Sequence, residues 1–205
     1  MTDGRRHAAI AGVGSALPDR VVPNVEFERF VDTTDEWIRD RTGIRERRFA
    51  AEGQTTSDLA ADATRAALDA AGLALEQVDL LVCATLSPDT PIPSTAVWVQ
   101  RKLGLSCPAF DVNSACAGFS YALSTGTAFI ESGAAETIVV MGAEVLSRVL
   151  DMTDRSTCVL FGDGAGAVVL RPSEHPGVLG SVLGADGSAA EILIIPAGGT
   201  LHPAS

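Results

Sequence analysis

A single cysteine stands where an expected strand gives way to an expected helix, in "DVNSACAGFSYAL" from Asp111 to Leu123. In the first turn of such a helix, the unpaired amides and the positive end of the helix dipole would favour the Cys116 thiolate and lower its pKa. The backbone N–H of Cys116 would also point at the oxyanion that forms when a thioester carbonyl is attacked. Position alone favours the plainer alternative, an inert packed thiol. Cys116 is therefore either a nucleophile for acyl transfer or a core residue.

Five arginines within ten residues form a second candidate site. They are Arg39, Arg41, Arg45, Arg47 and Arg48. Such a cluster can bind a phosphate or an acidic protein, even on a chain whose net charge is -11. The alternative is a solvated edge whose arginines face neighbouring acidic residues. Charge alone does not separate these two interpretations.

Two glycine-rich stretches, "GVGSAL" at Gly12 and "GDGAGA" at Gly162, resemble nucleotide-binding loops, but neither completes G-x-G-x-x-G. Pro18 also prevents a helix directly after the first stretch. In "FGDGAGAVVL" we expect the glycines to let backbone segments pack closely near a site, with the Asp163 carboxylate accepting hydrogen bonds from turn amides.

The remaining cysteines and the composition limit the class of protein. The four cysteines contain no CxxC pair and no histidine lies at a metal-ligand spacing, so we expect no metal site. Cys83, Cys107 and Cys158 lie in or beside apolar runs, which is typical of free thiols in a cytoplasmic protein. The start "RRHAAIAGVGSAL" is similar to an export signal, but its short, glycine-rich apolar part favours a strand and a turn ending at Pro18.

The overall composition, with 46% hydrophobic residues in 205, predicts a compact globular protein. The acidic net charge argues against a nucleic-acid partner. No apolar run reaches transmembrane length, so no membrane partner is expected.

Apolar periodicity predicts strands and helices that alternate along the chain. Strands are expected at 8–13, 78–87, 107–112, 137–145 and 158–172, and helices at 24–31, 33–43, 58–72, 93–104 and from Cys116 to the stop at Gly133. The last of these helices carries no formal charge up to Ile130, so we expect it to be buried. The alternation predicts an α/β fold with a mostly parallel central sheet, whose carboxyl strand ends, including the one before Cys116, carry the reactive groups.

Helix starts can also be read from the sequence. We expect Asn24 to cap the first helix, Thr33 to cap the second with Glu36 at capping-box spacing, and Thr56 or Ser57 to cap the third. From Gly177 the sequence predicts a new strand followed by an irregular segment.

Five motifs in a fixed order then point to a family. "DTTDEWIRDRTGIRERR", "CPAFDVNSACAGFSYAL", "DMTDRST", "FGDGAGAVVL" and "IPAGG" together resemble β-ketoacyl-acyl carrier protein synthase III, a thiolase-fold condensing enzyme of fatty acid synthesis. The resemblance runs from about Ala8 to the end of the chain. It implies a thiolase-like α/β fold, with residues 1–172 as a βαβαβαββ N-terminal half and residues 173–205 as the start of the second half.

The resemblance also implies roles for single residues. Cys116 matches the acyl-accepting nucleophile of the motif "ACAGF", and Phe161 matches an aromatic wall near it. Trp37 and Arg155 match the pair that sandwiches the adenine of coenzyme A, which their flat faces suit. The resemblance further places Thr33 and Arg41 beside the same nucleotide and Ile92 at the position that enters the acyl pocket of the partner subunit.

The reaction implied by the resemblance needs no cofactor. Cys116 would take an acetyl or other short acyl group from acyl-coenzyme A, and the carbanion from malonyl-acyl carrier protein would then attack the acyl-enzyme. The family's homodimers meet near the strand before the nucleophile, here "CPAFDV". The same features also fit a starter-unit ketosynthase of polyketide assembly.

The family's catalytic His and Asn follow the "IPAGG" region, and none of this chain's three histidines lies in that motif. They are His7, His175 and His202. We therefore expect that the 205 residues alone do not catalyse condensation. A different class of function, a non-catalytic truncated or split-gene product acting as a binding or assembly partner, stays open on the same ground.

Overall fold

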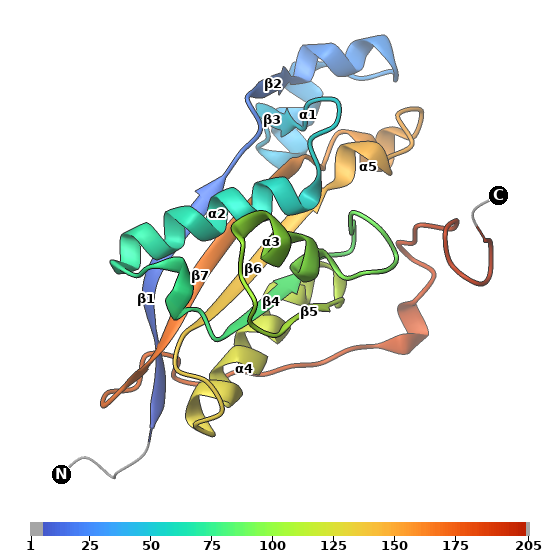
Figure 1. Ribbon diagram of the computed structural model, residues 1–205. Coiled ribbons are helices and arrows are strands. Elements are labelled where there is room, and N and C mark those ends of the chain that lie inside the picture. Colours follow the sequence, from blue (N-terminus) through green and yellow to red (C-terminus); the bar gives the residue numbers. More distant parts are fainter. Residues whose placement is uncertain (1–5, 204–205) are drawn as a thin grey trace.

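A five-stranded mixed sheet forms the centre of the protein (Figure 1). The computed structural model describes residues 6–203. In sheet order the strands are β1 (His7–Ala16), β7 (Asp163–Ser173), β6 (Ile138–Val145), β4 (Leu80–Ala84) and β5 (Ala109–Val112). The prediction that residues near the N-terminus form a strand rather than an export segment is confirmed from His7 onward, while Arg5 lies outside the described residues.

The expectation of a mostly parallel sheet was wrong. β4 runs parallel to both β5 and β6, but β7 runs antiparallel to β6 and to β1. The chain between β6 and β7 stays at one end of the sheet, where it forms η4 (Leu146–Arg148), a 3-10 helix, and α5 (Arg155–Cys158). Without a crossover along the sheet, the next strand can only run back antiparallel.

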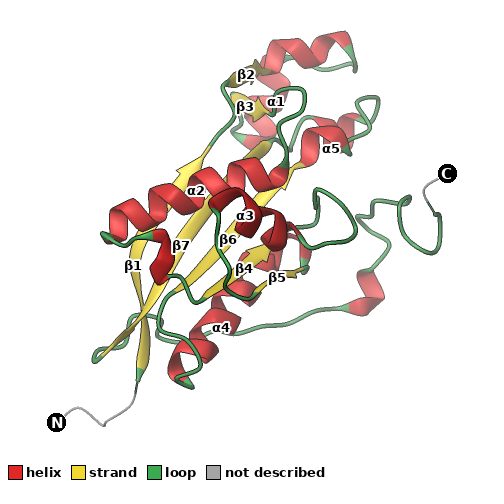
Figure 2. Cartoon of the chain, in the orientation of Figure 1, coloured by secondary structure: helices red, strands yellow, loops and turns green. Residues whose placement is uncertain are grey.

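Helices cover both faces of the sheet (Figure 2). On one face, α2 (Thr56–Ala71) and α3 (Thr95–Leu103) share a buried core with alternate residues of β6 such as Val139 and Met141. On the other face, α4 (Gly118–Glu131) packs against the residues between them, among them Ile138 and Val140. Alternation along a strand thus assigns each β6 residue to one layer.

Glycine at two positions of β1 lets α2 lie directly on the strand. A Cβ atom on Gly14 would come within 2.3 Å of the Ala67 nitrogen, and one on Gly12 within 2.3 Å of the Ala67 oxygen. These are backbone atoms of a buried helix, so they cannot turn aside as a flexible side chain can. Gly12 and Gly14 therefore allow the close approach of α2 to β1.

A smaller unit sits at one end of the sheet (Figure 1). It consists of the hairpin of β2 (Arg20–Pro23) and β3 (Glu46–Phe49), the 3-10 helix η1 (Asn24–Arg29), α1 (Asp35–Thr42) and α5. The buried guanidinium of Arg47 lies 4.3 Å from the centre of the Phe27 ring and donates to the carbonyls of Val22 and Val159. Arg47 therefore joins the hairpin to the segment after α5.

Three predicted helix caps were wrong. Thr34, not Thr33, caps α1, and its hydroxyl accepts from the Trp37 amide at 3.1 Å. Thr55 caps α2 in a capping box with Asp58, so the expected Thr56 and Ser57 already lie inside the helix.

Asn24 does not cap a helix either, because it is buried at the first position of η1. Its amide group donates instead to the Asp35 side chain at 2.9 Å and to the Ile44 carbonyl at 2.7 Å. At the two threonine caps, a neighbouring threonine offers an equivalent hydroxyl group, whereas the Asn24 side chain is taken up by tertiary hydrogen bonds.

Helix α4 is buried on one face only, which corrects the expectation of a buried helix. Gly118, Ala122, Gly126 and Ile130 are buried, whereas the Phe119 and Phe129 side chains are each 36% exposed. A helix without formal charge up to Ile130 therefore leaves apolar side chains partly exposed.

The segment after β7 forms no strand within the described residues 174–203, contrary to expectation. It holds only a short 3-10 helix, η5 (Gly187–Ala189), and runs outward beside α4, where the Tyr121 hydroxyl donates to the Gly184 carbonyl at 3.0 Å (Figure 1). Several of its apolar side chains are strongly exposed, for example Val182 and Leu201. In residues 6–203, no helix is long and apolar enough to cross a membrane.

Replacing Gly14 by alanine tests the contact between α2 and β1. Because the new methyl group would meet helix backbone, we expect Gly14→Ala to lower the free energy of unfolding by about 1–3 kcal/mol. Gly166 is a matched control on the neighbouring strand, since its Cβ would have no atom nearer than 3.9 Å. Urea unfolding followed by circular dichroism gives both values, and equal stability of the two variants would contradict the packing argument.

Candidate active site

Three parallel strands end side by side at the same end of the sheet. Ala84 at the end of β4 pairs with Val112 of β5 on one side and with Gly142 of β6 on the other. The chain leaves β5 here and reaches Cys116 within four residues. As the sequence predicts, Cys116 lies at the carboxyl end of a strand.

Cys116 is exposed, in a 3-10 turn, η3 (Ala115–Ala117), that runs directly into α4. It thus precedes the first residue of α4, slightly earlier than expected. The residue before it, Ala115, has a φ of 43°, in the left-handed region that alanine rarely adopts. Such a conformation persists only where the surroundings hold it.

A hydrogen bond within the turn and packing of the start of α4 against β4 hold the turn with Cys116 in place. The Ala117 amide donates to the Ser114 carbonyl at 3.0 Å. A Cβ atom on Gly118 would lie 3.3 Å from the Ala84 side chain, so the start of α4 rests on the end of β4. Exposure and position distinguish Cys116 from a packed core cysteine.

Two carboxylates that the sequence did not single out anchor the loops at this end of the sheet. Asp111 accepts from the amides of Thr95 and Ala96, at 2.6 and 2.8 Å, and so caps α3. Burial raises the pKa of the Asp111 carboxyl, and these amide hydrogen bonds oppose the shift. The sequence signal was an acidic residue inside an otherwise apolar strand, "AFDV".

The second carboxylate is Glu144 on β6, which is half-buried. It accepts from the amides of Leu86 and Ser87 at 2.9 and 3.0 Å and from the hydroxyl of Thr85 at 3.2 Å. The Ser87 hydroxyl also donates to it. One side chain therefore binds the whole turn that follows β4.

The predicted adenine-binding residues come together, although more than a hundred positions separate them in sequence. The guanidinium of Arg41 lies 4.6 Å, and that of Arg155 4.7 Å, from the centre of the Trp37 ring. Arg155 also donates to the Asp32 carbonyl at 2.8 Å. Thr33 lies next in the chain, and its buried hydroxyl has no hydrogen-bond partner within the described residues.

The arginine cluster does not act as one surface. Arg47 is buried, and burial lowers the pKa of its guanidinium. Arg39 pairs with Asp35 at 3.2 Å, and Arg48 donates to two backbone carbonyls. In the part of the chain that the structure describes, Arg41 and Arg45 are the members of the cluster that are exposed and lack a salt bridge. Only Arg39 matches the interpretation of a solvated edge with an acidic neighbour, and binding of a phosphate or an acidic protein stays a prediction for Arg41 and Arg45.

The other two predicted residues lie apart from each other. Phe161 is half-buried between α5 and β7, at the end of the sheet where β6 and β7 meet. Ile92 is 87% exposed in the loop between β4 and α3, so it contacts little of its own chain. Asp163, next to this region, accepts from the amides of Ala50 and Ser147, which confirms the predicted role of its carboxylate.

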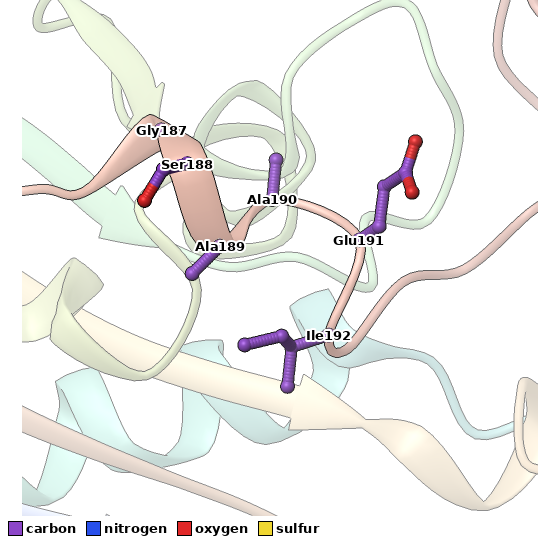
Figure 3. A pocket seen from close by; sticks show the side chains of 6 residues that line it. All are labelled: Gly187, Ser188, Ala189, Ala190, Glu191 and Ile192. Atoms are coloured by element: carbon purple, nitrogen blue, oxygen red, sulfur yellow. The ribbon is translucent and has the colours of Figure 1, made fainter.

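A hollow of about 370 Å³ occurs elsewhere, around η5 (Figure 3). One continuous stretch, residues 187–192, lines it, and its only charged side chain is Glu191. None of the predicted site residues lines this hollow, so it is not part of the candidate active site.

Comparison with known proteins gives one consistent family. The model of the family 3-oxoacyl-[acyl-carrier-protein (ACP)] synthase III matches residues 110–187. The chain is 54% identical over 195 residues to a β-ketoacyl-[acyl-carrier-protein] synthase III of Xanthomonas campestris, covering 95% of this chain and 60% of that relative. Over 95% of its length, the chain matches part of β-ketoacyl-[acyl-carrier-protein] synthase III.

Solved structures agree with this family. The 3-oxoacyl-[acyl-carrier-protein] synthase III of Aquifex aeolicus superposes with a TM-score of 0.79 at 50% identity, over 82% of this chain and 55% of that one. The priming β-ketosynthase of the R1128 polyketide pathway gives a TM-score of 0.87 at 41% identity, over 90% of this chain and 56% of that one. The α/β architecture is thus thiolase-like, as predicted, and the chain spans about 60% of the length of the curated relatives it matches.

Selective alkylation tests the exposure of the Cys116 thiol. Burial raises the pKa of the Cys83, Cys107 and Cys158 thiols, and nearby acidic groups add to this shift at all three. We therefore expect iodoacetamide at pH 8 to label Cys116 at least about ten times faster than any of the other three. Peptide mass spectrometry measures the four rates, and Cys116→Ser should remove the fast phase; preferential labelling of Cys107 would contradict the assignment.

Proposed function

We propose that Cys116 is the acyl-accepting nucleophile of a β-ketoacyl-[acyl-carrier-protein] synthase III. The observation that carries this proposal is an exposed cysteine, in a turn with a strained residue at the carboxyl ends of parallel strands, in a chain that matches this family. The Cys116 thiolate attacks the thioester carbon of an acyl-coenzyme A, the primer being acetyl or another short acyl group. The new thioester forms at Sγ, and coenzyme A leaves as its thiol after taking up a proton.

The second half of the proposed reaction forms a carbon–carbon bond. Malonyl-acyl carrier protein loses carbon dioxide, and the resulting carbanion attacks the acyl carbon on Cys116. The Cys116 thiolate leaves, and the β-ketoacyl product stays on the carrier protein. We assign this step to a protein of the relatives' full length, because the resemblance places its His and Asn beyond the "IPAGG" motif.

We assign the adenine of coenzyme A to the cluster of Trp37, Arg155 and Arg41. An indole and a guanidinium both offer flat faces to a base, and the exposed Arg41 suits a phosphate. The free, buried hydroxyl of Thr33 supplies a hydrogen-bonding group beside them. Phe161 is assigned to the wall of the acyl site and Ile92, which projects outward, to the acyl pocket of a partner subunit.

The same proposal covers assembly, domain division and location. β5 is an edge strand of the sheet, which leaves one side of it open for pairing in a homodimer. We take residues 1–172 as one half of the thiolase-like fold and residues 173–205 as the start of the other, in keeping with the end of β7 at Ser173 and the exposed segment after it. A cytoplasmic location fits the four free cysteines.

Polyketide priming is the second candidate, because the R1128 priming enzyme is a close structural neighbour. The fatty acid role is better supported, since sequence identity reaches 54% with the synthase III of Xanthomonas campestris and 41% with the R1128 enzyme. The two differ in primer and carrier. Competition between acetyl-coenzyme A and longer acyl-coenzyme A primers separates them.

Acylation of Cys116 tests the proposed function directly. Incubation with acetyl-coenzyme A should add one acetyl group to the peptide that carries Cys116, and Cys116→Ala should abolish the adduct. Intact-protein and peptide mass spectrometry give the result, with circular dichroism as the check on folding. A folded protein that forms no adduct would overturn the proposal and favour a non-catalytic binding role.

Coenzyme A binding tests the nucleotide site separately. Loss of a stacked group costs about 1–3 kcal/mol, so Arg155→Ala and Trp37→Ala should each weaken coenzyme A binding roughly 5- to 100-fold in isothermal titration calorimetry. Arg101→Ala is the matched control, because Arg101 stacks at 5.6 Å on the other tryptophan, Trp98. Equal loss of affinity in the control and in Arg155→Ala would argue against the assigned site.

A further inference from the structure

We propose that Glu144 is a positioning residue for Cys116, acting through the turn after β4; its place in the reaction rests on the proposed function. Glu144 lies on β6, two residues beyond Gly142, and both face the layer of α4. Cys116 lies in the turn at the start of that helix, at the same end of the sheet. The two residues are joined by a short series of contacts.

The first contact is between Glu144 and the turn of residues 85–87. Two amides and two hydroxyls donate to the one carboxylate, and the side chains of Thr85 and Ser87 are 5% and 8% exposed. The Ser87 hydroxyl in turn accepts from the Val145 amide at 2.9 Å. Because these donors are buried or half-buried, losing the carboxylate would be costly: the Leu86 amide and the Thr85 hydroxyl donate to Glu144, and among the described residues the Ser87 amide has only the Thr85 hydroxyl as a further acceptor, at 3.2 Å.

The second contact joins that turn to the nucleophile. The Thr85 amide donates to the Val112 carbonyl at 3.3 Å, which extends the parallel pairing of β4 and β5 by one residue. Val112 is the last residue of β5, and Asn113 and Ser114 lead from it to the turn with Cys116. Ala84, adjacent to Thr85, supports Gly118 on the other side of Cys116. The segment 84–87 therefore holds the turn at both its start and its end.

The strained conformation of Ala115 explains why this support matters. A residue with φ of 43° next to the nucleophile would relax if its neighbours could shift, and the orientation of the Cys116 thiol and amide would change with it. Asp111, which binds the start of α3, fixes the other face of the same strand end. Glu144 and Asp111 together keep β5 from moving in either direction.

The chemistry of the side chain at position 144 is specific. A carboxylate accepts hydrogen bonds at both oxygens, as two amides and two hydroxyls require. Glutamine has the same shape, but its NH₂ group would face a donor of the turn, and alanine would leave the Leu86 amide without its acceptor and the Ser87 amide with only the Thr85 hydroxyl. We therefore expect function to fall from Glu144 through Glu144→Gln to Glu144→Ala.

The experiment measures the alkylation rate of Cys116 by iodoacetamide in these variants of the full chain. We expect Glu144→Ala to slow it about three- to tenfold, and Glu144→Gln to lie between it and the parent protein. Asp79→Asn is the matched control, because Asp79 accepts from the amides of Glu136 and Thr137 and thus joins β4 and β6 at the opposite end. We expect this control to stay within about twofold of the parent rate.

Labelling of the buried Cys83 on β4 shows whether a variant has lost protection throughout the core rather than at the turn alone. If Cys83 stays protected while Cys116 slows, the effect is local to the turn, as proposed. Unchanged Cys116 rates in folded Glu144 variants, or equal slowing in Asp79→Asn, would overturn the inference. Acylation by acetyl-coenzyme A, run in parallel, separates the two claims: no adduct in the parent protein would reject the proposed function, while the alkylation rates would still decide the role of Glu144.

Discussion

The parallel pairing of β4 with both β5 and β6 is the constraint on which the rest of the structure depends. Because Ala84 is in register with Val112 and Gly142, β4 and β5 end at one level and β6 continues to Val145, so the segments that follow all three strands lie at the same end of the sheet. The turn with Cys116, the turn after β4 and the chain leading to α5 all begin there. A single antiparallel neighbour, β7, then returns the chain along the sheet without disturbing this arrangement.

Carboxylate side chains hold the segments that lie at this end of the sheet. Asp111 accepts hydrogen bonds from the first two amides of α3, and Glu144 and Asp163 accept from backbone amides of the connecting segments. Burying a carboxylate is unfavourable unless such donors surround it, and loop amides need acceptors just as much. Each pairing satisfies both requirements and gives the loop a defined position. A rigid loop is what a reaction between two large thioester substrates needs, because small errors in position are costly.

Local signals in the sequence predicted where most helices and strands lie, but not how these elements are arranged relative to one another. The glycines after α1 and α2, and the apolar run of β4, indicated these elements correctly. Helix caps failed at Thr33 and Thr56, because an adjacent threonine was equally suited and only the fold decides between them. The direction of β7 failed as well, since a connection that contains a helix can either cross the sheet or stay at one end. The three-dimensional fold decides both the cap residues and the direction of β7, and a local sequence pattern does not contain that information.

The candidate site divides in the same way. Cys116 was suggested by its position at a strand end, and Trp37 and Arg155 by resemblance alone, since 118 positions separate them in the sequence. Glu144 carries only the weak signal that Asp111 also carries, an acidic residue inside an apolar strand, and such a residue near a strand end usually meets solvent. The contact of Arg155 with Trp37 has one further consequence. A guanidinium 4.7 Å from the ring centre leaves no room for a base between them, so an adenine that enters must separate the two groups. The indole emission of Trp37 will change when this occurs, and with Trp98 replaced the protein becomes its own optical sensor for nucleotide occupancy.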